Sequence, residues 1–401
     1  MNIVVQKYGG TSIENIEKIQ NIAKKIVSKK QKGEGLVVVL SAMGKTTDEL
    51  IQLAKQISPT PKSRELDLLM STGEQISISL MSIALQELGY ESIALTGFQA
   101  GIQTQGYYTK SRIQDIDIKT IKTYVQEGKI VVVAGFQGIN EVGAITTLGR
   151  GGSDTTAVAL AAKLECACEI YTDVDGIYTV DPRLVPTAKK LDYISYEEML
   201  EMSSLGSGVM ETRAVEMGQK YNVPIYVALS HEEWPGTYIK EYDATMESKI
   251  ITGMSVSDKD LMVTLYCVPY HIKNISMIFQ EISQKDINVD MISQTAPLNG
   301  VVNVSFTVPK EDENVILEII GELQKNWTNM KADIQKDITK LSVVGIGMRS
   351  QSGVAAKMFE ILAENNIEFK QVTTSEIKIS YAISTKDQQK AIESIIKEFD
   401  L

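Results

Sequence analysis

Gly149-Arg150-Gly151-Gly152-Ser153-Asp154-Thr155-Thr156 runs directly into the alanine-rich residues 157–162, and the interpretation of the chain starts from this junction. Its three glycines allow a tight turn and let a ligand approach the backbone closely. Ser153 or Asp154 can cap the helix that follows, and the free N–H groups at a helix N-terminus favour an anion. The Arg150 guanidinium fits a carboxylate or a phosphate. The stretch predicts an anion site in which Asp154 holds something else, an ammonium group or a metal; a capped glycine-rich turn is the structural alternative.

A second loop of the same kind, Lys7-Tyr8-Gly9-Gly10-Thr11-Ser12, follows the apolar residues 2–6. Behind it, apolar residues recur at helical spacing, so the order is again strand, glycine turn and helix. The glycines would bring the backbone against phosphate oxygens, and Ser12 would cap the helix while it contacts them. Lys7 would neutralise charge that moves between a nucleophile and a leaving phosphate. A capped turn with a solvated lysine is the alternative for this loop taken alone.

Further candidate side chains follow the buried strand that is predicted over residues 36–40. Ser41 and Thr47 place hydroxyl groups at its carboxyl end, where parallel sheets bind ligands. Glu74 lies in a long helical pattern beside Gly73, a residue that weakens a helix. The Glu74 carboxylate is therefore expected either to point into the binding edge of the sheet or to be an ordinary solvated glutamate.

A third region is acidic. The strand that ends in Thr172-Asp173-Val174-Asp175-Gly176 predicts a nucleotide pocket with Mg²⁺ nearby. Arg183, in the turn Asp181-Pro182-Arg183, would supply a second guanidinium for phosphate. A solvated acidic turn is the alternative.

The order of the predicted elements gives the fold class of the first part of the chain. Strands and helices alternate up to about residue 230, which predicts an α/β domain with an open, mostly parallel sheet and helices on both faces. Residues 1–235 would form this domain, with an irregular excursion over residues 97–118, and the polar residues 236–249 would form a linker.

The last part of the chain contains an internal repeat. Residues 259–337 and residues 338–401 each follow the order of a βαββα unit. The second copy stops before its last strand, and residues 250–258 are expected to supply that strand. The two α+β units would then be interlocked rather than arranged one after the other.

Composition restricts the class of protein. The 401 residues are 43% hydrophobic and 23% charged, as in a globular protein, and the formal net charge of −11 argues against nucleic acid or an anionic membrane as the main partner. Three cysteines cannot form a disulfide framework, which fits a reducing compartment. Because neither a signal sequence nor an apolar run of spanning length is recognised, the sequence predicts a soluble, cytoplasmic protein.

Taken together, these motifs resemble those of the aspartokinases, which belong to the amino acid kinase family. The two C-terminal copies resemble tandem ACT domains, ferredoxin-like modules that sense amino acids. The resemblance extends over essentially the whole chain. It implies the ATP-dependent phosphorylation of L-aspartate to 4-phospho-L-aspartate, the first step of lysine, threonine and methionine biosynthesis.

The resemblance also implies roles for individual residues. Lys7 and Asp154 would be catalytic. The ATP, with Mg²⁺ and without a metal site built from protein ligands, would be bound by Lys7, Gly9, Gly10, Ser12, Thr172, Asp173, Tyr178, Asp181 and Arg183. The L-aspartate would be bound by Ser41, Thr47, Glu74, Arg150, Gly151, Ser153 and Asp154. An inhibitory end product, lysine with threonine as alternative or companion, would be bound by Asn288, Asp290, Gln294, Thr374, Ser375 and Glu376.

Other interpretations stay open from the sequence. The chain could phosphorylate glutamate or acetylglutamate instead, or it could be a non-catalytic amino-acid sensor. Assembly as a homodimer or higher homo-oligomer through the ACT domains is expected in either case. Two departures from the family pattern bear on the site. Gly208 stands where many relatives carry a lysine that helps to bind nucleotide, and Tyr270 stands where the first ACT loop usually presents an aspartate, which leaves the effector open.

Overall fold

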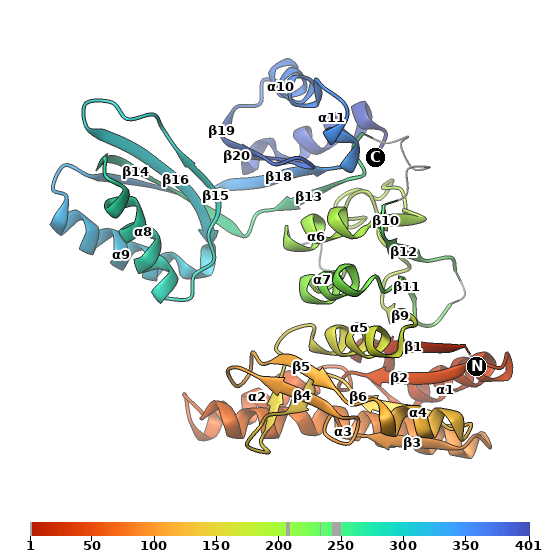
Figure 1. Cartoon of the computed structure of the whole chain (residues 1–401). Coiled ribbons are helices and arrows are strands. Elements are labelled where there is room, and N and C mark those ends of the chain that lie inside the picture. Colours follow the sequence, from red (N-terminus) through yellow and green to blue (C-terminus); the bar gives the residue numbers. More distant parts are fainter. Residues whose placement is uncertain (1, 206–208, 233, 243–249) are drawn as a thin grey trace. The chain divides into compact units, whose positions relative to one another are not determined.

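The computed structural model describes residues 2–205, 209–232, 234–242 and 250–401 (Figure 1). The chain folds as two compact units, and each unit is built from three separate stretches of the sequence. The first unit comprises Met1–Tyr178, Lys190–Ser203 and Gly208–Ala244, and the second comprises Thr179–Lys189, Ser204–Ser207 and Thr245–Leu401. Gly208, the departure noted in the sequence, lies outside the described residues.

The main sheet of the first unit is mostly parallel, as expected. Within the described residues its eight strands have the order β10 (Tyr193–Ser195), β12 (Thr237–Lys240), β11 (Ile225–Leu229), β9 (Ala167–Thr172), β1 (Ile3–Tyr8), β2 (Gly35–Leu40), β6 (Ile130–Ala134) and β3 (Ser92–Leu95). From β11 to β3 neighbouring strands are parallel, whereas β12 is antiparallel to β11. Every residue of β2 is buried, because a strand in the middle of such a sheet is covered on both faces.

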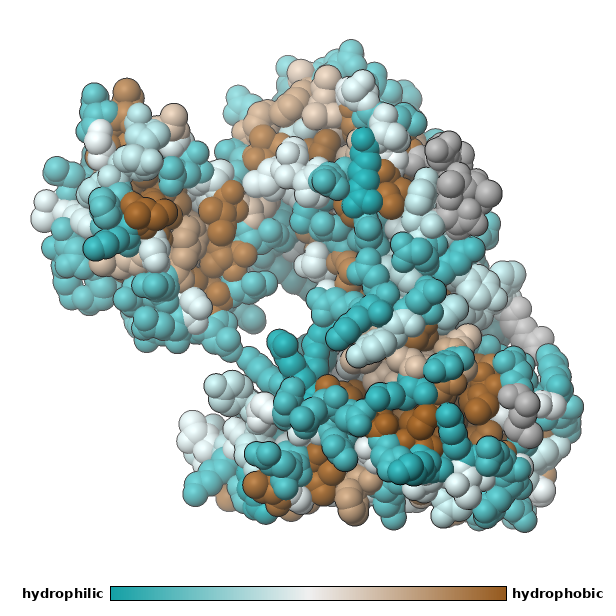
Figure 2. Space-filling view, viewed as in Figure 1, coloured by the Kyte–Doolittle hydropathy of each residue, from teal (hydrophilic) through white to brown (hydrophobic). Residues whose placement is uncertain are grey.

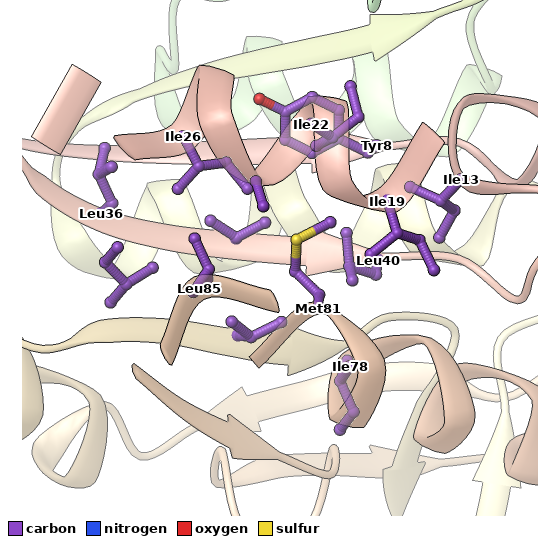
Figure 3. Close-up of a cluster of buried hydrophobic side chains, with 14 of the residues drawn as sticks. Tyr8, Ile13, Ile19, Ile22, Ile26, Leu36, Leu40, Ile78, Met81 and Leu85 are labelled. Carbon is purple, nitrogen blue, oxygen red and sulfur yellow. The ribbon is translucent and has the colours of Figure 1, made fainter. Parts of the chain in front are cut away.

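Helices cover both faces of this sheet. One face carries α1 (Ile16–Gln31) and α3 (Ser63–Glu87), with α2 (Thr46–Ile57) packed on α3. The other face carries α4 (Lys119–Gln126), α5 (Gly152–Leu164) and α7 (Thr212–Tyr221), and α6 (Tyr196–Ser204) follows β10. Figure 3 shows how α1 and α3 present apolar side chains at the same i, i+3, i+7 spacing: Ile19, Ile22 and Ile26 from α1, and Ile78, Met81 and Leu85 from α3. They meet Tyr8, Leu36 and Leu40 of the central strands, and each burial of this kind contributes about 1.5–3 kcal/mol.

A smaller sheet corrects one expectation. Residues 97–118 are not irregular, because they contain β4 (Ile102–Gln105) and β5 (Arg112–Ile116), which pair with β7 (Gln137–Ile139) and β8 (Ile145–Thr147) in the order β5-β4-β7-β8. These strands are short and partly exposed, so no buried apolar run marks them in the sequence. The expected linker is also wrong in part: Thr237–Lys240 is the strand β12, and residues 243–249 lie outside the described residues.

The second unit contains two antiparallel sheets of four strands each, as far as the chain is described. The first has the order β15 (Asp290–Gln294), β16 (Val301–Pro309), β14 (Asp260–Pro269) and β17 (Lys331–Gln335), with α8 (Ile272–Gln284) and α9 (Glu313–Asn326). The second has the order β13 (Gly253–Ser257), β18 (Ile338–Val344), β20 (Lys378–Ser384) and β19 (Phe369–Thr374), with α10 (Val354–Glu364) and α11 (Gln388–Phe399). Because β13 precedes the first sheet in sequence but pairs with β18 of the second, the interlocked arrangement is confirmed.

One segment of the second unit comes from the middle of the chain. We call Thr179–Lys189 the strap. The Met254 N–H donates a hydrogen bond to the Thr179 carbonyl at 2.7 Å. Val180 and Val185 lie in the apolar core that the second sheet forms with α10 and α11. Sequence periodicity could not predict that this segment packs into the second unit, because two isolated valines form no periodic pattern.

The helix α3 is long and apolar enough, by length and hydropathy, to cross a membrane, and half of its most apolar window is buried inside the protein. It also carries the buried carboxyl groups of Asp67 and Glu74. The face of the molecule in Figure 2 shows apolar residues among hydrophilic ones in the region where Figure 1 places α2 and α3. The packing of α3 against the main sheet makes it a core helix of the first unit.

Candidate active site

A pocket of about 240 Å³ opens at the carboxyl ends of β1 and β2, beside the start of α5. All of its lining residues belong to the first unit. They are Lys7, Gly10, Ser41, Ala42, Gly44, Thr47, Glu74, Phe136, Gly149, Arg150, Gly151, Gly152, Ser153 and Asp154. The structure thus brings together every residue that the sequence analysis assigned to the acceptor substrate, and it places Lys7 with them.

The start of α5 differs from the expectation. The helix begins at Gly152, and Gly151 precedes it with a left-handed φ of 63°. Ser153 and Asp154 therefore lie in the first turn and are not the N-cap, which corrects the sequence analysis. A Cβ atom at Gly151 would also lie 2.4 Å from the Cβ of Glu211, so this position needs glycine for two independent reasons. The turn leaves Arg150 exposed at the mouth of the pocket.

Lys7 and Asp154 form an ion pair inside the pocket. The distance from Lys7 Nζ to an Asp154 carboxylate oxygen is 2.6 Å, and the side chains are 10% and 13% exposed. Lys7 lies on the face of β1 that α5 covers, so the strand and the helix supply one partner each. This pair answers the question that the sequence left open. Asp154 holds the ammonium group of Lys7 rather than a metal, and it fixes the position of that ammonium group.

Glu74 is buried, so the solvated alternative is wrong. The side chain lies on α3, and Oε1 accepts a hydrogen bond from the Ala42 N–H at 3.1 Å. Its Oε2 is buried and has no hydrogen-bond partner among the described residues. Burial raises the pKa of Glu74 to about 8. Glu74 is therefore mainly neutral at pH 7, and a cation bound beside it would favour the ionised form.

Gly10 and its neighbours serve the packing of two loops. A Cβ atom at Gly10 would lie 2.6 Å from the Ala42 carbonyl oxygen, so glycine lets the loop after β1 approach the loop after β2. The Gly9 N–H donates to the Tyr171 carbonyl at 3.2 Å.

Ser12 does not cap α1, which is a correction, because the Asn15 side chain accepts from the Lys18 N–H at 2.9 Å instead. Ser12 is buried, and its hydroxyl has no partner among the described residues.

The remaining residues expected around ATP are divided between the units. Thr172, Asp173 and Tyr178 belong to the first unit, and Asp181 and Arg183 belong to the strap in the second. The Tyr178 hydroxyl donates to Asp175 at 3.0 Å, and Lys190 pairs with the same carboxylate. Asp181 pairs with Arg183, with a shortest distance of 2.6 Å. Asp173 is therefore exposed, whereas the Asp175 carboxylate is bound by Tyr178 and Lys190.

The expected effector residues are only partly available to a ligand. Asp290 forms an ion pair with Lys340 at 2.9 Å, and Lys340 also pairs with Asp260 at 3.3 Å. Burial disfavours the charged form of Lys340, but Asp290 and Asp260 outweigh it and raise the pKa of this lysine. Glu376 pairs with Arg349 at 3.1 Å. Resident cations thus occupy both carboxylates that were assigned to a cationic effector; Asn288, Gln294, Thr374 and Ser375 are exposed.

Two functional candidates were missed in the sequence. Phe136 lines the pocket in a left-handed conformation with φ of 68°, and its N–H is held by the Thr156 hydroxyl at 3.1 Å. The one available signal was its place between Gly135 and Gly138 after a buried strand. Gln371 joins the two four-stranded sheets of the second unit, because its side-chain amide donates to Ser293 Oγ at 3.0 Å and to the Met291 carbonyl. A polar residue in a strand carries no sequence signal for such a contact.

A mostly parallel sheet with glycine loops at its carboxyl ends, and a pocket with paired Lys7 and Asp154, define a phosphotransferase of the amino acid kinase type. The profile of the amino acid kinase family matches residues 2–229, and that of an ACT domain matches residues 341–399. Aspartokinase 2 of Bacillus subtilis is 48% identical over 402 residues, which cover 100% of this chain and 98% of that protein. The chain therefore belongs to the amino acid kinase family and, within it, to the aspartokinases.

Solved structures agree at the level of the fold. A crystal structure of E. coli aspartokinase III in complex with aspartate and ADP matches with a TM-score of 0.80 at 22% identity, covering 100% of both chains. The same enzyme in complex with lysine and aspartate also matches with a TM-score of 0.80, at 21% identity and 99% coverage of both chains.

Proposed function

We propose that the chain transfers the γ-phosphoryl group of ATP to the side-chain carboxylate of L-aspartate, which gives ADP and 4-phospho-L-aspartate. One observation carries this proposal: Lys7 of β1, Glu74 of α3 and Arg150 of the loop before α5 line one pocket. A substrate with two carboxylates and one ammonium group is complementary to two cations and one anion. Since Asp154 is committed to Lys7, Glu74 is the anion that remains. The relatives that match over the whole chain support the same substrate.

The residues divide the work between binding and charge neutralisation. A side-chain carboxylate oxygen of aspartate attacks Pγ, the bond from Pγ to the bridging oxygen breaks, and ADP leaves with the electron pair. The carboxylate is already ionised at neutral pH, so positioning and electrostatics suffice. Arg150 would bind the α-carboxylate and Glu74 the α-ammonium group. Lys7, held by Asp154, would neutralise the charge that moves from the nucleophile to the leaving group.

ATP would enter as its Mg²⁺ complex. In such sites Mg²⁺ takes most of its ligands from phosphate and water, with one or two carboxylates from the protein. Asp173 is exposed at the end of β9 and fits this role, whereas Asp175 is held by Tyr178 and Lys190. Within the part of the chain that the structure describes, no group of three or more His, Cys, Asp or Glu side chains could hold a metal. The phosphates would therefore bring the Mg²⁺ with them.

The test is ADP formation with a panel of acceptors. L-aspartate should support turnover, and hydroxylamine should trap the product as a hydroxamate because an acyl phosphate is an activated carboxyl group. L-glutamate and N-acetyl-L-glutamate should give little turnover. Turnover with one of these acceptors but not with aspartate would support the rival kinase, and binding of amino acids without ADP formation would support the sensor.

We also infer that an end-product amino acid inhibits the enzyme through its ACT domains, at the first step towards lysine, threonine and methionine in the cytoplasm. The paired ACT units support this inference, and contact through them would make the enzyme a homo-oligomer. Lysine is the first candidate, with threonine as alternative or companion. Because Asp290 and Glu376 carry resident cations, lysine must displace one of these cations or bind through neighbouring polar groups.

The inhibition is tested on the whole chain with lysine, with threonine and with both. Glu376→Ala should relieve inhibition and leave kcat without effector nearly unchanged, while Glu368→Ala, an exposed acid of the same ACT unit, should leave inhibition intact. A ligand shifts the enzyme only by its differential affinity for the inactive state, a coupling of about 1–3 kcal/mol. Calorimetry that detects neither amino acid at the ACT domains would overturn the assignment of effector.

A further inference from the structure

Two charged side chains hold the backbone next to the Arg150 loop without lining the pocket. Asp67, on α3, is fully buried. Its carboxylate accepts hydrogen bonds from the Thr109 N–H at 2.9 and 3.0 Å, from the Thr147 N–H at 3.0 Å and from the Thr147 hydroxyl at 2.7 Å. All of these donors are neutral, and burial raises the pKa of Asp67. Burial of a carboxyl group is costly unless its oxygens accept hydrogen bonds, and both oxygens of Asp67 accept them.

Arg213, on α7, approaches the same backbone. Its guanidinium donates from Nη1 to the Leu148 carbonyl at 2.6 Å and from Nη2 to the Ser111 carbonyl at 3.2 Å. Asp67 therefore binds an N–H group of Thr147, and Arg213 binds the carbonyl of the next residue. A negative and a positive side chain hold consecutive residues at the end of β8, each through the backbone group of the opposite polarity.

The two charged residues also share a second segment, residues 107–111. Asp67 holds the Thr109 N–H, and Arg213 holds the Ser111 carbonyl. The Ser111 N–H in turn donates to the Thr147 carbonyl at 3.0 Å. Gly149 has a φ of 81°, and a Cβ atom there would lie 3.1 Å from the Thr109 carbonyl oxygen. The residue before Arg150 thus rests on the segment that both charged residues fix.

We propose that Asp67 and Arg213 are positioning residues that fix residues 149–152 and thereby set where the Arg150 guanidinium meets the acidic substrate. The geometry carries the proposal: two charges from α3 and α7 converge on the same two backbone segments, directly before Arg150. Its consequence for catalysis rests on the proposed function. Asp67 lies seven residues before Glu74, two turns along the same buried face of α3, so this one helix both lines the pocket and holds the neighbouring loop.

The test uses the full chain with Asp67→Asn and Arg213→Lys. The asparagine of the first variant would turn its amide N–H₂ towards backbone donors, and the lysine of the second cannot reach two carbonyls with a fork of donors. Both variants should raise the aspartate KM about tenfold and leave kcat and the ATP KM within twofold. Amide hydrogen exchange of residues 149–153 should accelerate at least tenfold in both variants. Ser82 lies on the same helix α3 as Asp67, and Ser82→Ala removes its buried hydrogen bond to Ser92 of β3. This variant is the stability control and should change neither the aspartate KM nor the exchange of residues 149–153.

A double-mutant cycle separates positioning from general destabilisation. In an Arg150→Ala background, Asp67→Asn should add less than twofold to the aspartate KM, because the residue that it positions is gone. An equal factor in both backgrounds, or an unchanged KM in Asp67→Asn and Arg213→Lys, would refute the proposal. If Asp67→Asn does not fold, Arg213→Lys decides alone. Absence of turnover with aspartate in the wild type would overturn the proposed function, while unchanged exchange at residues 149–153 would independently overturn the positioning role.

Discussion

The ion pair between Lys7 and Asp154 determines what each residue can do. The two charges lie 2.6 Å apart and both side chains are nearly buried, so they attract each other more strongly than they would in bulk water. Asp154 is therefore not available for the substrate ammonium group, and Lys7 is held before substrate arrives. An ammonium group that needs no reorganisation at the moment of transfer contributes to the rate rather than to ground-state binding.

Replacement of the two cations should therefore affect different kinetic constants. Lys7→Ala should lower kcat by roughly a hundredfold or more with little change in the aspartate KM. Arg150→Ala should mainly raise the aspartate KM, since a charge-assisted contact of about 1.5–3 kcal/mol is lost. Asp154→Asn, which keeps the shape but removes the charge that holds Lys7, should lower kcat by a smaller factor. Steady-state kinetics measures all three, and an unchanged kcat in Lys7→Ala would remove Lys7 from the mechanism.

Glu74 should make aspartate binding depend on pH. Burial raises the pKa of Glu74 to about 8, so its carboxyl group is mostly protonated at pH 6.5, while the substrate ammonium group needs the ionised form. The aspartate KM should therefore fall as pH rises from 6.5 to 8.5, by up to about tenfold per pH unit below the pKa, and then level off. Calorimetry in two buffers of different ionisation enthalpy should detect proton release on binding. Glu74→Gln should abolish both the release and the slope; a flat KM in the wild type would contradict this account.

At the scale of elements, helices whose apolar residues recur at a regular spacing could be predicted from the sequence. Helix ends that depend on backbone angles could not be predicted. The i, i+3, i+7 pattern of Ile19, Ile22 and Ile26 identifies α1 because side-chain period alone places them on one face. The loops that carry Lys7 and Arg150 could be found because each follows a strand and precedes a helix. The cap of α5 could not, since the left-handed φ of Gly151 shifts the start of the helix to Gly152.

The contacts of the candidate site divide in the same way. The place of Lys7 in the pocket follows from its position at the carboxyl end of a parallel strand, whereas Glu74 reaches the pocket from α3 and Arg150 from the loop after β8 of the smaller sheet. That Asp154 pairs with Lys7, and that Lys340 pairs with Asp290, depends on which faces of distant elements meet. A single sequence contains no distance between residues so far apart, so acidic residues such as Asp290 are easily assigned to a ligand when a resident cation already occupies them.

The strand β13 should decide whether the second ACT sheet folds. It pairs with β18 from Gly253 opposite Val344 to Ser257 opposite Lys340, and it buries Met254. A piece of the chain that comprises residues 258–401 leaves β18 as an unpaired edge and should aggregate. A piece that comprises residues 250–401 should be more soluble and melt at a higher temperature. Both pieces lack the strap, so the difference between them reports on β13; equal melting and solubility would show that β13 is dispensable.

At the scale of the whole molecule, the strap is a part of the second unit that lies between two parts of the first unit in the sequence. It leaves the first unit after Tyr178 and returns at Lys190, and between these residues it contributes Val180 and Val185 to a core of the second unit. Asp181 and Arg183, which the family resemblance assigns to the nucleotide, lie on this same segment. Because a segment packed into a core moves with that core, we expect the position of Asp181 and Arg183 to depend on the packing of the second ACT sheet.

Truncation of the strap's valines should therefore change nucleotide binding from within the second unit. Val180→Ala together with Val185→Ala removes buried methyl groups at a cost of about 1–3 kcal/mol each, and should raise the ATP KM several-fold without changing the aspartate KM. Val304→Ala, a fully buried valine in the core of the first ACT sheet, is the matched control: it should lower the calorimetric melting temperature but leave the ATP KM unchanged. The strap carries no coupling if both replacements raise the ATP KM equally or if neither raises it. An ATP effect confined to the strap would mean that the packing of the second ACT core influences nucleotide binding.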